Sequence, residues 1–245
     1  MLLWLEWWKW AVRLRGACLR ERTFSWLLVV LAGFAVREDM LGVSSFIRCL
    51  ELLPCCYDRI LDFFHSNALN TAGLARIWTD SVLTFHPGIV RFGGMPVIVG
   101  DGLKAPKSSR KMPGVKLLHQ ESESNTKPEY VMGHSCQAVC LLVWGLAGVM
   151  ALPLTAAIHE GVVFSNRDHR TLLDKMVSLV FSLNIEEAFI FLADSYYVSR
   201  KIILPLLARG CHLVSRLRSN AVAYLFAPPP PPGKRGRPQL YGEKI

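Results

Sequence analysis

The chain has 245 residues, of which 51% are hydrophobic, and it carries a formal net charge of +9. This size and composition exclude a disordered chain and a small disulfide-stabilised scaffold, and they are typical of one large or two smaller folded domains. The 7 cysteines include no Cys-x-x-Cys pair, so we expect no disulfide framework, no zinc site and a cytoplasmic location. The basic charge favours nucleic acid or an anionic membrane as a partner, although a basic protein without either has the same composition.

The first 85 residues are predicted to form a helical domain. Tryptophans alternate with charges near the N-terminus, and positions 4, 7, 8 and 11 share one helical face. This favours a helix docked through its aromatic side over one lying at a membrane interface. Apolar residues at helical spacing predict further helices over 24–36, 43–53, 57–65 and 71–85. The second and third of these are compatible with a DNA-binding helix-turn-helix, but any helical hairpin has the same pattern.

After His86-Pro87-Gly88 the pattern changes to short apolar runs that are later separated by helical segments. We expect strands over 96–100, 132–143, 147–156, 188–193 and 211–216. We expect helices over 168–183, capped by Asp168, and from a cap at Ser195 to 208, kinked at Pro205. The polar and basic residues 102–130 are predicted to form a loop. The resulting order, β-β-β-α-β-α-β, predicts an α/β fold with a mixed sheet of the ribonuclease H-like type.

One uncharged segment, residues 138–158, is long enough to span a membrane as a helix. The alternative is a pair of buried strands joined by a turn at 145–148, and the strand order above favours it. Residues 26–36 are also apolar but too short to span. We therefore expect no membrane partner, and a small membrane protein remains the third hypothesis for this chain.

Two of the predicted strands end in a single carboxylate, Asp101 after Val-Ile-Val-Gly and Asp194 after Phe-Leu-Ala. In the predicted order the first and fourth strands lie side by side, so both acids should project into one site. Carboxylate oxygens are the ligands that Mg²⁺ prefers. Each Asp alone is also a common turn residue or helix N-cap. Because the fold pairs the two strands, a metal site is favoured.

The amino-acid sequences of three segments resemble those of the DDE transposases of bacterial insertion sequences, which are named for an Asp-Asp-Glu triad. These segments are residues 96–134, IHEGVVFSNRD at 158–168 and FLADSYYVSRKIILPLL at 191–207, and the likeness extends over residues 85–245. The resemblance implies that Asp101 and Asp194 are the first two acids of the triad. It also implies two divalent ions, Mg²⁺ or Mn²⁺, that support cleavage of DNA at element ends and transfer to a DNA target.

The resemblance further implies a third acid, a Glu on a helix beyond the last predicted strand. Glu243 is the only acid after position 194, and its context does not match. We therefore expect a C-terminally truncated transposase with little or no strand transfer, so whether this chain is an enzyme stays open. Glu160, at the end of the third strand, is an alternative acid for the site. The second hypothesis is a catalytically dead DNA-binding fragment, either a homodimer or associated with a full-length transposase and interfering with it.

Basic residues that follow the first acid, and others in the C-terminal tail, are expected to contact DNA phosphates. They are Lys104, Lys107, Arg110, Lys111 and Lys116 after the first acid, and Lys234, Arg235 and Arg237 in the tail. The tail combines five prolines, 228–232, with a basic core similar to an AT-hook, although a plain linker is the alternative. Each lysine after the first acid is equally compatible with a solvated loop charge. Together these patterns predict a helical domain at 1–85, a catalytic domain at 86–226 and a Pro-rich basic tail at 227–245.

Overall fold

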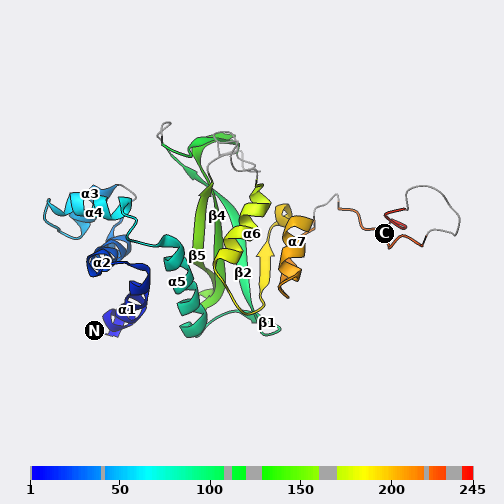
Figure 1. Ribbon diagram of the computed structural model, residues 1–245, viewed down its shortest axis with the longest axis horizontal. Coiled ribbons are helices and arrows are strands. Elements are labelled where there is room, and N and C mark those ends of the chain that lie inside the picture. The colour runs from blue at the N-terminus through cyan, green and yellow to red at the C-terminus, as the bar shows by residue number, and fades with distance from the viewer. Residues whose placement is uncertain are drawn as a thin grey trace.

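A mixed β-sheet lies at the centre of the chain, with a helical unit beside it (Figure 1). The computed structural model describes residues 2–39, 42–107, 112–119, 129–159, 170–217, 221–229 and 239–244. The strands are β1 (Arg91–Phe92), β2 (Met95–Pro106), β3 (Lys116–His119), β4 (Tyr130–Gly145), β5 (Gly148–His159), β6 (Ile190–Ala193) and β7 (His212–Val214). β4 pairs antiparallel with β2 and β5, while β2 pairs in parallel with β6 and β6 with β7. The predicted ribonuclease H-like order is therefore confirmed.

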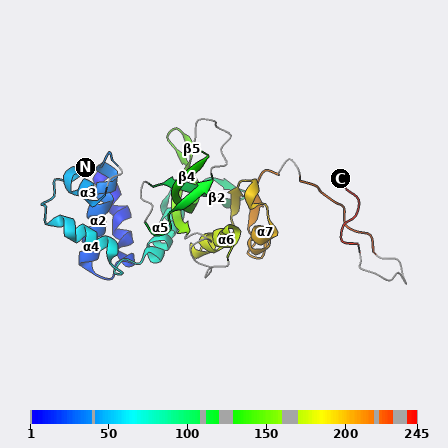
Figure 2. The same ribbon diagram turned by 90° about the horizontal axis from the view of Figure 1, so that it is seen from above.

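Two helices cover one face of this sheet. α6 (Leu172–Ser182) and α7 (Arg200–Leu207) lie on the same side of the strands (Figure 2). Along β2, the buried residues Pro96, Ile98 and Gly100 alternate with half-buried ones, which is the period of a strand with one face on a core. The apolar residues of α6, α7 and the central strands join in a single core.

The N-terminal helices contain a second core, to which every one of them after α1 contributes. They are α1 (Leu2–Arg13), α2 (Glu21–Val36), α3 (Val43–Cys49), α4 (Cys56–His65) and α5 (Thr71–Phe85), with a short 3₁₀ helix, η1 (Leu14–Ala17), after the first. The predicted helices are present, although α3 ends at Cys49 and not at residue 53. Phe24, Phe46 and Phe63 are buried in this core. α5 joins the two units, because the indole of Trp78 donates a hydrogen bond to the Pro153 carbonyl of β5 at 2.8 Å.

β2 is longer than predicted, and this changes the setting of Asp101. The strand continues from Met95 through Asp101 to Pro106 and pairs with β4 along that length. The expected loop after Asp101 also contains β3, which pairs with the start of β4. Asp101 therefore lies inside a β-ladder instead of at a strand end. The segment 102–106 contains Gly and Pro and has no apolar alternation, so its sequence did not indicate a strand; its side chains are mostly exposed and its backbone pairs with β4.

The uncharged segment 138–158 forms most of the β4–β5 hairpin and not a helix. Its turn lies between Gly145 and Gly148, as predicted, and Gly148 has a φ of 123° that favours glycine. Among the residues that the structure describes, no helix has the length and apolar character needed to cross a bilayer.

The predicted cap of α6 is wrong. Thr171 caps the helix through a reciprocal box, in which its hydroxyl accepts a hydrogen bond from the Asp174 amide while the Asp174 carboxylate accepts one from the Thr171 amide. The predicted cap, Asp168, lies outside the described residues.

The predicted cap after β6 is also wrong. A short 3₁₀ helix, η2 (Ser195–Tyr197), follows the strand and is capped by Asp194. α7 begins only afterwards, with Ser199 as its cap in place of Ser195. Pro205 lies inside α7, as expected.

Candidate active site

The parallel pairing of β2 with β6 places the two predicted acids next to each other. In the register of these strands Gly100 of β2 lies opposite Ala193 of β6. Asp101 directly follows Gly100, and Asp194 directly follows Ala193. Both acids are exposed. Because side chains alternate between the faces of a strand, this register continued by one residue turns the two carboxylates toward the face opposite to that of Gly100.

A local backbone amide fixes one oxygen of each carboxylate. Asp101 Oδ1 accepts a hydrogen bond from the Gly102 amide at 2.7 Å, and Asp194 Oδ1 accepts one from the Tyr196 amide at 3.0 Å. Asp194 is thus a helix cap, which is one of the two interpretations that the sequence allowed. The cap uses one carboxylate oxygen of Asp194, and both oxygens of a carboxylate can accept hydrogen bonds. The second oxygen of each acid has no hydrogen-bond partner within the described part of the chain.

Tyr197 ends the 3₁₀ helix that Asp194 caps, and its hydroxyl would lie 3.6 Å from a Cβ added at Gly102, the neighbour of Asp101. It is 3% exposed. Burial, together with the negative charges of Asp101 and Asp194, raises the pKa of Tyr197 to about 12. The phenol therefore stays neutral at ordinary pH.

A buried amide holds Tyr197 in place. Gln137 on β4 is 2% exposed, and its Nε2 donates to the Tyr197 hydroxyl at 3.1 Å and to the Leu172 carbonyl at 3.0 Å. Its Oε1 lies 2.8 Å from Nε2 of His159 on β5. The network connects β4 with its neighbour β5, the start of α6 and the turn that carries Asp194. A satisfied buried network of this kind fixes the positions of the elements that it joins.

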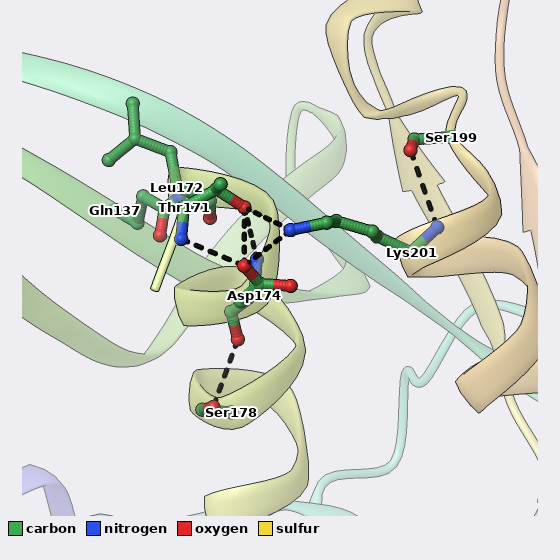
Figure 3. Close-up of polar contacts among 7 residues, drawn as sticks. All are labelled: Gln137, Thr171, Leu172, Asp174, Ser178, Ser199 and Lys201. Atoms are coloured by element: carbon green, nitrogen blue, oxygen red, sulfur yellow. Dashed lines mark hydrogen bonds and ion pairs between the residues drawn. The ribbon is translucent and has the colours of Figure 1, made fainter. Parts of the chain in front are cut away.

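A second polar cluster joins the starts of α6 and α7 (Figure 3). Lys201 Nζ lies 2.7 Å from Asp174 Oδ2 and 3.3 Å from the Thr171 hydroxyl. The hydrogen bonds from Lys201 and Thr171 lower the pKa of Asp174 to about 2. The pair is partly solvated, with 49% of the lysine side chain and 32% of the aspartate side chain exposed. It orients the two helices against each other at the end of the sheet that carries the acids.

Three of the predicted DNA-contacting lysines are among the described residues, on β2, just after it and on β3. Lys104 Nζ donates to the His119 carbonyl of β3 at 2.5 Å, so this side chain is engaged by the hairpin backbone. Lys107 is exposed just after β2. Lys116 begins β3, and partial burial and the ammonium of Lys175 lower its pKa. The structure does not show these lysines in contact with either acid.

The other predicted contacts and one alternative acid fall where the structure gives no description. Arg110 and Lys111, the tail residues Lys234, Arg235 and Arg237, and Glu160 lie outside the described residues. Glu243 is described, but it lies in the C-terminal segment 239–244, and both views draw the C-terminal end of the chain away from the sheet (Figures 1 and 2). Within the described ranges no three His, Cys, Asp or Glu side chains form a group that could hold a metal ion.

Gln137 and Tyr197 are residues that sequence reasoning did not select. Gln137 had a usable signal, because it is the only amide in the apolar run Cys136–Trp144, where a buried polar group needs partners. Tyr197 had none, since an aromatic residue after a strand is ordinarily a packing residue. Its role depends on the 3₁₀ turn that follows β6, which was not predicted.

Comparison with known proteins gives one family. A family model described as DDE superfamily endonuclease matches residues 16–245. No curated protein matches the chain. Among solved structures the chain is similar to a piggyBac transposase in a synaptic complex with hairpin DNA, with a TM-score of 0.43, 13% identity, and coverage of 82% of this chain and 43% of that one. This chain thus spans less than half the length of that transposase. Because the family model covers nearly all of the sequence, the chain belongs to the DDE superfamily endonucleases.

Proposed function

We propose that this chain is a transposase-type nuclease that binds DNA and acts on its phosphodiester bonds with divalent metal ions at Asp101 and Asp194. The observation that carries the proposal is the parallel pairing of β2 and β6, which brings two acids distant in sequence to neighbouring positions. Membership of the DDE endonuclease family supports the same assignment. The DNA is proposed to include both the ends of a mobile element and its target.

The two acids are suitable ligands for Mg²⁺ or Mn²⁺. Mg²⁺ takes oxygen ligands and is commonly held by one or two carboxylates together with water and substrate phosphates. Asp101 and Asp194 each keep one oxygen that no backbone amide occupies. When bound there, such ions supply activation of water and stabilisation of the leaving oxygen in an in-line displacement at phosphorus.

The residues around the acids keep this site in one geometry. Tyr197 and Gln137 anchor the turn that carries Asp194 to β4. Because burial and the two acids raise the pKa of Tyr197 to about 12, the phenol adds no third negative charge beside them. Lys104 and Lys107, on and just after the exposed end of β2, are proposed to contact the DNA backbone.

A second candidate function is DNA binding without cleavage. It is favoured by the finding that the described residues bring two carboxylates together and no third. A triad member supplies both a ligand and negative charge to a metal pair, so a site with two acids should hold its ions weakly. In this case the chain would occupy DNA and would not cut it.

The two candidates are separated by metal binding and plasmid nicking measured on the same variants. Wild type, Asp101→Asn and Asp194→Asn are titrated with Mn²⁺ by calorimetry and incubated with supercoiled plasmid and Mg²⁺ or Mn²⁺. Asp58→Asn is the matched control, because it removes an exposed acid from α4, far from the sheet. We expect Mn²⁺ binding to be lost in both active-site variants and kept in the control.

Nicking by the wild type that disappears in both active-site variants would support the nuclease. Mn²⁺ and DNA binding without nicking would support the second candidate. The metal site itself is refuted if Asp101→Asn and Asp194→Asn bind Mn²⁺ as the wild type does.

A further inference from the structure

The N-terminal helices contain a basic cleft that the proposed nuclease site does not use. It has a volume of about 230 Å³ and lies between the beginning of α2, α4 and the segment after α4. Arg20, Arg22 and Arg59 line it together with Trp26 and one acid, Asp62. We call it the arginine cleft, defined by its three arginines.

The walls of the cleft are held together by backbone hydrogen bonds. Just before α2 the Leu19 amide donates to the Ala68 carbonyl at 2.9 Å. The Asn70 amide donates to the Ala17 carbonyl at 2.9 Å, and an isolated β-bridge joins Cys18 to Leu69 between them. The segments that border the cleft on its two sides are thus tied to each other. A ligand would meet a site that is already formed, which lowers the ordering cost of binding.

Within the described part of the chain, the positive charge of the cleft is offset only in part. Arg20, Arg22 and Arg59 form no salt bridge with any other described residue. Glu21 lies between Arg20 and Arg22 in sequence, but it pairs with Arg15, whose Nη2 lies 2.6 Å from Glu21 Oε1. The remaining lining acid, Asp62, leaves an excess of two positive charges among the residues that line the cleft.

We propose that the arginine cleft binds a backbone phosphate of double-stranded DNA, so that the helical unit contacts DNA separately from the acids on the sheet. Guanidinium groups match phosphate oxygens in a two-pronged geometry. The half-buried Trp26 supplies an apolar wall for the adjoining sugar. This inference rests on the proposed function for the choice of DNA as the ligand. It further assigns the place on the helical unit that would contact the DNA.

The test measures DNA affinity of the full chain as a function of salt, without divalent metal. A fluorescent duplex of arbitrary sequence is titrated by anisotropy with wild type, Arg59→Ala, Arg22→Ala/Arg59→Ala and Arg48→Ala. Arg48 is the matched control, since it is exposed in the same helical unit, carries the same charge and pairs with Asp39 outside the cleft. Arg59→Lys separates charge from guanidinium geometry.

Each lost phosphate contact should reduce the slope of log Kd against log salt by about 0.9 and weaken binding about tenfold near 0.1 M salt. We therefore expect about tenfold weaker binding for Arg59→Ala and about a hundredfold for the double variant, with Arg48→Ala unchanged. Arg59→Lys should keep the slope and bind less tightly than wild type. Since the three arginines are exposed, these changes leave both cores intact, which circular dichroism verifies.

The outcomes distinguish the cleft from the nuclease. If the wild type binds DNA and the double variant binds it as Arg48→Ala does, the cleft proposal is wrong and the nuclease proposal stands. If the wild type binds no DNA, both fall. Anionic phospholipid vesicles form a third arm. Vesicle binding that depends on the arginines while DNA binding does not would overturn the proposal in favour of a membrane surface.

Discussion

Replacing Gln137 with leucine is expected to lower the free energy of unfolding by about 3 kcal/mol. The amide is 2% exposed and takes part in three hydrogen bonds. Leucine has a similar size but no polar atoms, so the Tyr197 hydroxyl and the His159 ring each lose a bond in the interior. A buried group that loses its partner costs about 1–3 kcal/mol. Greater apolar burial offsets roughly 1 kcal/mol of the sum.

The assay is urea unfolding followed by far-UV circular dichroism, arranged as a double-mutant cycle with Tyr197→Phe. Each single variant removes the bond between the Gln137 amide and the phenol. The double variant should therefore be less destabilised than the sum of the two singles, by about 1 kcal/mol. Strictly additive values, or a Gln137→Leu variant as stable as the wild type, would refute the network as described.

Two further predictions concern core packing and pH. In Gly100→Ala the new Cβ would lie 2.6 Å from Cε2 of Phe191 and closer still to Cζ, so we expect about 1–3 kcal/mol of destabilisation in urea unfolding. Gly102→Ala is the control, because its nearest neighbour would lie at 3.6 Å, and an equal loss there would contradict the packing argument. The hydrogen bond from Lys201 lowers the pKa of Asp174 from 3.8 to about 2, so its contribution is present above pH 4 and is lost as pH falls toward 2. Asp174→Asn should lose less than about 1 kcal/mol at pH 7, since the pair is solvated, and should differ less from wild type at pH 2.

The order of elements could be predicted because the signals for it are local. The turn at 145–148, the apolar runs of β4, β5 and β6 and the helical spacing of α6 are each visible in the sequence, and the structure has all of them. The neighbourhood of Asp101 and Asp194 then followed from the strand order alone. The prediction that the two acids are neighbours depended on the topology, because each acid alone is equally typical of a turn residue.

The polar details could not be predicted because they depend on contacts between distant segments. The exposed half of β2 has no apolar alternation, and its strand is defined only by pairing with β4. Gln137 acquires its role from η2 and from β5, which lie far along the chain. Arg59 and Arg22 are ordinary helix-surface residues until α2 and α4 are placed together. Such residues become recognisable only when the three-dimensional neighbours are known.

The pairing of the acids depends on a strand register that is set on the opposite face of the sheet. A slip of β6 against β2 by one residue would turn Asp194 away from the face of Asp101. Phe191 packs against Gly100, a position where even one added carbon is too close, so this contact favours the observed register. Gly100→Ala should therefore weaken Mn²⁺ binding at the acids as well as the fold, although it removes no ligand. Gly102 is as close to Asp101 in sequence as Gly100 is, but a Cβ there would lie 3.6 Å from its nearest neighbour, so Gly102→Ala should leave that affinity unchanged. The opposite ranking of the two variants would show that the register is fixed elsewhere.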